Sequence, residues 1–406
     1  MSEMVINKIS FLPRLIIGII LGIIVGLALP GWFGRILYTF THIFGELLSY
    51  IIPLIIVSFI STSIASLGAK AGRFLAGTAG LAYLSSFAAG IAAFFISLAV
   101  ISLIVEPGAA GDPEAVVLTP YLELNIPPVM GVVTALITGF ILGLGINALR
   151  QKTRQVSYLF NVMEELRAIV VIVINKVIIP FLPFYIAGIF ADMAATGEAF
   201  KTLSVFGQVF ILIILMHLGY LVVKFSIAGI RTGNNPFKAL KNMAPAYTTA
   251  LGTNSSAATI PVSLRSAKSN GVSKRIAEFV VPFSANIHLP GSTITLVTCS
   301  VAVVVIGEGV PEFSKFLPFI IMLGVTMILA PGIPGGGVVA ALGLMSSILG
   351  FTEPEQGLML ALYKAQDGLG TACNVTGDGA LSMIVDSFSK NSSSGEAAAV
   401  YQAEGD

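Results

Sequence analysis

The residues of this chain that are best suited to chemistry form a polar stripe within an apolar stretch near the C-terminus. Lys364, Asp367, Thr371, Asn374 and Asp378 follow one another at intervals of three and four residues. On a helix, this spacing places all five side chains on one face. An ionisable group in hydrocarbon surroundings is costly, and its default interpretation is a substrate or ion site. The stripe therefore predicts a helix that lines a polar binding cavity.

The composition places this stripe in a membrane protein. Only 11% of the 406 residues are charged, whereas soluble proteins carry roughly 25%. The net charge of +1 argues against a nucleic acid as the partner. The 42 glycines and 20 prolines exceed what simple spanning helices need, and irregular backbone at membrane depth is tolerated where it is buried in protein or lines a cavity. We therefore expect an all-α membrane protein with interrupted helices.

Six apolar stretches in the first 235 residues predict transmembrane helices, because each is about as long as a bilayer crossing requires. Their expected bounds are residues 15–34, 47–67, 74–105, 129–148, 169–194 and 202–223. Basic residues gather after the second, fourth and sixth helices; those after the sixth are Lys224, Arg231, Lys238 and Lys241. Because loops rich in Lys and Arg remain in the cytoplasm, we expect both termini to be cytoplasmic.

Two further segments are expected to form re-entrant helical hairpins. Residues 242–264 are uncharged, but basic clusters flank them on both sides, so that both flanks should be cytoplasmic. A hairpin that enters the membrane and returns, expected at residues 236–265, resolves this conflict. A second hairpin is expected at residues 314–350, where the glycine- and proline-rich residues 331–337 interrupt an uncharged run. It would enter from the opposite side of the membrane.

A long helix follows each hairpin. The first, at residues 274–307, is interrupted around residues 286–292, and the second, at residues 355–389, carries the polar stripe. Two hairpin-plus-helix units of opposite orientation form an inverted repeat, which is typical of secondary transporters with a midplane substrate site. The expected fold is therefore an all-α membrane protein with eight transmembrane helices, two re-entrant hairpins and inverted repeats.

Three motifs in this arrangement resemble those of the dicarboxylate/amino acid:cation symporter family, which has the glutamate-transporter fold. They are residues 255–261 (Ser-Ser-Ala-Ala-Thr-Ile-Pro), residues 331–337 (Pro-Gly-Ile-Pro-Gly-Gly-Gly), and the series Asp367, Thr371, Asn374 and Asp378. The resemblance covers nearly the whole chain. It implies a homotrimer in the inner or plasma membrane that moves a small-molecule substrate by alternating access.

The resemblance also implies a division of the chain. Residues 1–235 would form mainly scaffold and trimerisation helices, although the third helix, at about residues 74–106, would join the transport bundle. Residues 236–390 would form the transport core, and residues 391–406 a polar tail.

Roles for individual residues follow from the same resemblance. Asp367 would bind a substrate α-amino group, and Thr371 and Asn374 would hydrogen-bond the substrate backbone. Ser255 and Ser256 would bind a carboxylate, which the N–H dipoles at a hairpin tip also favour. A glycine segment including Gly335 and Gly336 would form the extracellular gate, since glycine lets backbone approach a ligand closely. The full set of substrate candidates is Ser255, Ser256, Gly335, Gly336, Lys364, Asp367, Gly370, Thr371 and Asn374.

A cation site is implied around Asp378, with backbone carbonyls near Asn286 and Asn374. The candidates are Ser85, Ser86, Asn286, His288, Asn374 and Asp378. Sodium is the first candidate for the coupling ion and the proton the second, and no organic cofactor is expected. Two alternatives stay open. The serine hydroxyls could instead bond carbonyls of their own helix, and His288 could be a neutral structural residue, although histidine titrates near neutral pH.

The chain departs from the family pattern at positions that bear on ligand choice. Members with acidic substrates carry an arginine where this chain has Gly370, so the bidentate partner of a side-chain carboxylate is missing. Lys364 could replace it as a point charge, or could neutralise Asp367. Leu289 and Pro290 stand where the family has methionine and aspartate. We therefore favour a neutral amino acid over a dicarboxylate, and expect fewer sodium ions or a different ion.

Two other functional classes are weighed against symport. A substrate-gated or anion-conducting channel of the same fold would show flux without saturable exchange. An intramembrane enzyme lacks support, because no spacing motif joins serine, histidine and aspartate into a catalytic set. We therefore expect the protein not to be an enzyme.

Overall fold

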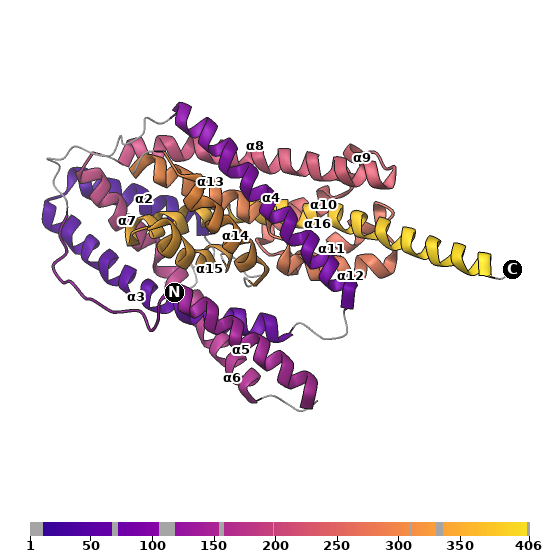
Figure 1. The fold of residues 1–406 in the computed structure, drawn as a ribbon. Helices are drawn as coiled ribbons and strands as arrows, with labels where there is room; N and C mark the ends of the chain where they lie inside the picture. The colour runs from indigo at the N-terminus through magenta and orange to yellow at the C-terminus, as the bar shows by residue number, and fades with distance from the viewer. Residues whose placement is uncertain are drawn as a thin grey trace, which may run out of the picture.

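A computed structural model describes residues 11–66, 72–104, 118–153, 158–197, 199–307, 310–329 and 336–403 of the chain, and all regular elements in these ranges are helices (Figure 1). The first half contains α2 (Phe11–Ala28), α3 (Gly31–Ser66), α4 (Gly72–Ile104), α5 (Val132–Thr153), α6 (Tyr158–Val173), the π-helix η2 (Ile174–Ile178), α7 (Ile179–Ala195) and α8 (Ala199–Thr232). The second half contains α9 (Pro236–Asn242), α10 (Ala244–Thr253), α11 (Ser256–Ser269), α12 (Lys274–Ile287), α13 (Pro290–Gly307), α14 (Phe313–Leu329), α15 (Gly336–Leu344), the π-helix η3 (Met345–Leu349) and α16 (Glu353–Ala403).

Several of these helices are long and apolar enough to cross a membrane. They are Gly31–Thr62, Gly77–Ile101, Tyr158–Ala195, Thr202–Thr232 and Lys274–Gly307. Shorter apolar helices, among them Pro13–Ala28 and Phe313–Ile328, accompany them. The all-helical, apolar architecture is that of an integral membrane protein, and the count of eight spans stays a prediction.

Two helix boundaries differ from those expected. The first break lies at Leu29 and Pro30, not at residues 35–46, because a residue that precedes proline disfavours the helical conformation. The sixth apolar helix, α8, does not end at residue 223 but continues to Thr232, because the residues after Lys224 are mainly apolar. Gly233 then ends it with a positive φ of 73°, as is common for a glycine after a helix.

The first helix packs closely against α7 through a glycine stripe. A Cβ atom at any of three positions, spaced four residues apart, would overlap backbone oxygens of α7; these positions are Gly18, Gly22 and Gly26. Small residues at this spacing allow membrane helices to approach closely. This contact joins the N-terminal helix to the α3, α5, α6 and α7 group, whose members also pack on one another.

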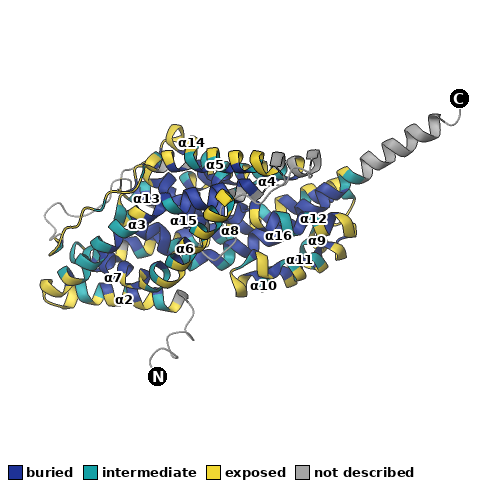
Figure 2. Cartoon of the chain, turned by 90° about the horizontal axis from the view of Figure 1, so that it is seen from below, coloured by how far each residue is buried: buried dark blue, intermediate teal, exposed yellow. Residues whose placement is uncertain are grey.

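The remaining helices surround α16. Its neighbours include α8, the two hairpin helices α10 and α11, and the two halves of the broken helix, α12 and α13. Helix α4 packs against α13 and α14, although it precedes them by about 200 residues. Figure 2 shows buried residues concentrated in α13, α15 and α16, while α2 and α10 carry many exposed ones. The buried polar face of α16 therefore lies inside the protein.

The expected interruptions are present where the structure describes them. Asn254, in the left-handed conformation with φ of 52°, and Ser255 connect α10 to α11 and form the tip of the first hairpin. Helix α12 ends at Ile287 and α13 begins at Pro290, with His288 extended between them. The interruption is expected because proline lacks an N–H and disfavours a helical residue before it. In the second hairpin, the residues between α14 and α15 lie outside the described ranges.

Candidate functional site

The polar stripe lies on a buried face of α16, as its spacing predicted. Asp367, Thr371, Asn374 and Asp378 are 6%, 7%, 2% and 1% exposed. The side chain of Lys364 is 7% exposed. The stripe divides into two clusters, one around Asp367 and one around Asp378.

The Asp367 cluster is largely local to α16. Lys364 Nζ donates to Asp367 Oδ2 at 3.3 Å, across a spacing of three residues. The Thr371 hydroxyl donates to the Asp367 carbonyl at 2.7 Å. Both charged side chains are nearly excluded from the surface, and removal of one partner from such a pair typically costs about 3–5 kcal/mol. Lys364 therefore neutralises Asp367 in this structure.

The tip of the first hairpin reaches α16 beside Asp367. A Cβ atom at Gly368 would lie 2.5 Å from Asn254 Oδ1 and 2.9 Å from the Leu251 carbonyl oxygen. The Ser255 hydroxyl accepts a hydrogen bond from Ala258 N at 3.3 Å and so caps α11, while Ser256 is buried at the start of that helix. A helix N-terminus favours negative charge. An anionic group thus has a favourable place at the tip, which contacts Gly368, the residue after Asp367.

Asn374 anchors the start of α13. Its Oδ1 accepts from Gly291 N at 2.7 Å, and its Nδ2 donates to Ser292 Oγ at 3.1 Å. Tyr363 also donates to Ser292 Oγ, at 2.9 Å. A Cβ atom at Gly291 would lie 2.5 Å from the Gly370 carbonyl oxygen and 2.7 Å from Cys373 Cβ. Glycine at position 291 is thus required for this close crossing of the two helices.

The second hairpin contributes to the same region. Gly335 lies outside the described residues, and Gly336 begins α15. A Cβ atom at Gly337 would lie 2.8 Å from the hydroxyl of Tyr363, which precedes Lys364 in α16. The described start of α15 therefore adjoins the Asp367 cluster on the side of Tyr363 and Ser292.

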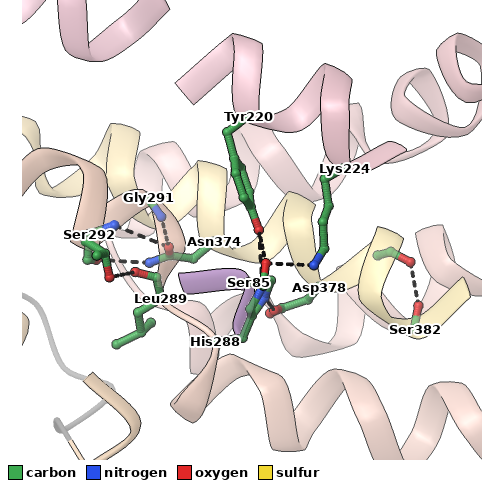
Figure 3. A network of polar contacts seen from close by, with 12 residues as sticks. Ser85, Tyr220, Lys224, His288, Leu289, Gly291, Ser292, Asn374, Asp378 and Ser382 are labelled. Carbon is green, nitrogen blue, oxygen red and sulfur yellow. Dashed lines mark hydrogen bonds and ion pairs between the residues drawn. The ribbon is translucent and has the colours of Figure 1, made fainter. Parts of the chain in front are cut away.

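The Asp378 cluster is assembled from four separate elements (Figure 3). Asp378 Oδ1 lies 2.8 Å from His288 Nδ1, in the gap between α12 and α13. His288 Nε2 lies 3.1 Å from Ser85 Oγ of α4 and 3.3 Å from the hydroxyl of Tyr220 of α8. Ser85 Oγ lies 2.7 Å from the hydroxyl oxygen of Tyr220. All these groups form one connected hydrogen-bond network.

Lys224 completes this network, although its position in the sequence did not predict a site residue. Its Nζ donates to Ser85 Oγ at 2.7 Å, and Ser85 in turn contacts His288, which contacts Asp378. The residue is only 9% exposed. Because the sixth helix was expected to end at residue 223, Lys224 was interpreted as a cytoplasmic charge. The signal that could have revealed it is the apolar run at residues 225–230, which continues the helix beyond the lysine.

Donors and acceptors in the network are ordered. A lysine ammonium only donates, and an ionised carboxylate only accepts. With Asp378 ionised, the hydrogen therefore resides on His288 Nδ1, and Nε2 accepts from Ser85 or Tyr220. Hydrogen bonds then run from Lys224 through Ser85 and neutral His288 to Asp378. In this protonation state, one positive and one negative charge are joined through neutral groups.

The structure brings together only part of the expected cation site. Ser85, His288 and Asp378 meet, whereas Asn374 is engaged with the start of α13. Asn286 is exposed, and its Nδ2 donates to the Pro282 carbonyl at 3.3 Å, away from the cluster. Ser86 is buried, but its hydroxyl has no hydrogen-bond partner within the described part of the chain.

The chain is similar to known transporters over most of its length. The family model described as the sodium:dicarboxylate symporter family matches residues 11–388. The serine/threonine transporter SstT of Enterococcus faecalis is 28% identical over 400 residues, which cover 92% of this chain and 90% of that protein.

Two animal transporters match over about half of the chain. The human excitatory amino acid transporter 1 is 28% identical over 209 residues, or 51% of this chain and 38% of that protein. The neutral amino acid transporter B(0) of Macaca fascicularis is 29% identical over 198 residues, or 48% of this chain and 36% of that protein. The match thus spans little more than a third of the length of these relatives. From the family match over residues 11–388, the chain belongs to the sodium:dicarboxylate symporter family.

Proposed function

We propose that this protein is a secondary active symporter that carries a small amino acid, preferably a neutral one, or a dicarboxylate together with a cation. The observation that carries the proposal is the Asp367 cluster, where Asp367 and Lys364 form a buried pair beside the hairpin tip and the start of α13. The names of the relatives, which include an excitatory amino acid, a neutral amino acid and a serine/threonine transporter, support an amino acid substrate.

The substrate ammonium would bind the carboxylate of Asp367 and would compete there with the Lys364 ammonium. The substrate carboxylate would lie at the tip of the first hairpin, near Ser255 and Ser256, where helix N-terminal N–H groups favour an anion. Thr371 and Asn374 would orient the substrate backbone, and the segment containing Gly335 and Gly336 would close over it.

The substrate side chain would lie near Gly370. No arginine fork is available at this position to bind a second carboxylate. With Lys364 held by Asp367, an acidic side chain lacks an obvious partner, which favours a neutral substrate. A dicarboxylate would require Lys364 to turn from Asp367 towards the substrate.

Transport would proceed by alternating access within a homotrimer in the inner or plasma membrane, with both termini cytoplasmic. The packing supports a division into two bodies, in which α2, α3, α5, α6 and α7 would form the scaffold. Helix α4 would move with the elements around α16, and α8, which the sequence placed among the scaffold helices, would move with them because it packs on α13 and α16. Sodium is the first candidate for the driving ion, as the family description implies, and the proton is the second. No enzymatic step is required.

Uptake by proteoliposomes tests this proposal. Purified protein would be reconstituted and supplied with labelled L-serine or L-aspartate, under an inward sodium gradient, an inward proton gradient, or neither. We expect saturable, gradient-driven uptake that favours L-serine and is lost in D367N. Uptake that no gradient drives would contradict symport, and flux that does not saturate would indicate a channel.

A further inference from the structure

Lys224 has no role in the function proposed above, although its ammonium lies inside the polar network around Asp378. It projects from the interior of α8, which continues to Thr232, and is only 9% exposed. A lysine so far from a helix end and from the surface is costly in a membrane protein, and such residues are usually functional. The question is what this ammonium does beside a carboxylate at which the family resemblance places a cation.

With the Lys224 ammonium and the Asp378 carboxylate both ionised, the charges of the network are balanced. Lys224 supplies a positive charge and Asp378 a negative one, while Ser85, Tyr220 and His288 connect them as neutral groups. A metal cation bound here would leave the buried network with an uncompensated positive charge. Burial of unpaired charge is strongly unfavourable. The electrostatics therefore oppose a second cation while Lys224 remains in place.

Two of the oxygen atoms that could bind a cation, Ser85 Oγ and Asp378 Oδ1, already have hydrogen-bond partners. Ser85 Oγ accepts from Lys224 at 2.7 Å and contacts the Tyr220 hydroxyl, and Asp378 Oδ1 contacts His288 Nδ1. Sodium sites at broken helices are formed by such oxygens together with unwound backbone carbonyls. Lysine itself has three donors and no acceptor, so it cannot be a ligand. With the Lys224 ammonium on Ser85 Oγ and His288 on Asp378 Oδ1, this site does not fit a sodium ion while Lys224 remains in place.

We propose that the Lys224 ammonium is a tethered cation that takes the place of a metal ion at Asp378 and closes this site to sodium. Lys224 is then a residue that determines ion specificity, and the ion that drives transport binds elsewhere. The statement about the ion that drives transport rests on the proposed symport function. The closure of the Asp378 site does not, because it is tested by sodium binding alone.

The test uses the full-length protein in detergent and measures its thermal transition as choline chloride is replaced by sodium chloride at constant ionic strength. K224M removes the charge and keeps the size of the side chain, and K224R keeps the charge. We expect the sodium-induced shift to be equal in wild type, D378N and K224R. K224M should gain an additional, saturable shift that K224M/D378N lacks, because the vacated carboxylate then binds sodium.

Two results would overturn the inference: a sodium-induced shift in wild type that D378N removes, or a K224M protein whose response equals that of wild type. If K224M does not fold, crystals of wild type soaked in thallium(I) give an independent answer. We expect no anomalous peak within ligand distance of the Asp378 carboxylate, and a peak there would contradict the tethered cation. Failure of every gradient to drive uptake would instead count against the symport function, because these readouts require no transport.

Discussion

The two aspartates of α16 share a helix and a buried face but are neutralised in different ways. Asp367 is paired with Lys364 from its own helix, three residues away. Asp378 is linked to Lys224 of another helix through Ser85 and His288, so that its partner is fixed by the packing of four elements. A pair within one helix can be opened by a side-chain rotation, whereas the second network can be opened only if several elements move.

This difference assigns different roles to two similar charges. In the proposed function, a substrate ammonium would replace Lys364 at Asp367 without disturbing the fold. At Asp378, the cation is part of the packed protein. Two carboxylates on the same face of a helix can therefore differ in whether a ligand can bind to them.

The largest effect is expected from D367N, which removes the charge pair that Asp367 forms with Lys364 of its own helix. The substitution removes the charge to which the substrate ammonium would bind and leaves Lys364 without its carboxylate. Truncation of one partner of a buried charge pair at a binding site typically costs about 2–5 kcal/mol, which corresponds to a loss of roughly 30-fold or more in affinity. Uptake and equilibrium binding of labelled L-serine should both fall to background. Retention of binding within about tenfold of wild type would show that the substrate does not use Asp367.

A second large effect is expected from G291A, at the helix crossing between the two clusters. The added Cβ would lie 2.5 Å from the Gly370 carbonyl oxygen, a backbone atom that cannot rotate away. Overpacking of this kind typically costs about 1–3 kcal/mol, so the thermal transition should occur at a lower temperature. G145A is the matched control, because a Cβ there meets nothing within 4 Å. Equal transition temperatures for the two variants would contradict the close crossing.

The fold and the clusters differ in how far the sequence could predict them. The uncharged run that became α4 and the proline that separates α12 from α13 were located to within a few residues, because both signals are local. The buried face of α16 followed from spacing alone. The Asp378 network did not, because Ser85, Tyr220, Lys224 and His288 come from distant segments. The misplaced end of α8 also concealed Lys224.

An intermediate effect is expected from G370R, which sharpens the distinction between neutral and acidic substrates. A Cβ at this position would meet its nearest neighbour, Ser292 N, at 3.6 Å, which is an ordinary contact. The guanidinium would supply a bidentate partner for a side-chain carboxylate. We expect the ratio of L-aspartate to L-serine uptake to rise by about tenfold or more, equivalent to roughly 1.4 kcal/mol. An unchanged ratio would mean that the substrate side chain does not lie near position 370.

The smallest effect is expected from N286A. Its side chain is exposed and donates to the carbonyl of Pro282 in its own helix, away from the Asp378 network. Surface substitutions of this kind usually change stability by less than about 0.5 kcal/mol. Uptake and its dependence on sodium should therefore remain close to wild type. A marked rise in the sodium concentration needed for half-maximal uptake would place Asn286 in the ion site after all.

The most direct test of the difference between Asp367 and Asp378 is an experimental structure of the wild-type protein with saturating L-serine. The account predicts that the serine ammonium contacts the Asp367 carboxylate and that Lys364 has moved away from it. It also predicts that the hydrogen bonds from Lys224 through Ser85 and His288 to Asp378 are unchanged. Serine bound elsewhere while Lys364 still contacts Asp367, or a metal ion at Asp378 with Lys224 displaced, would contradict the account.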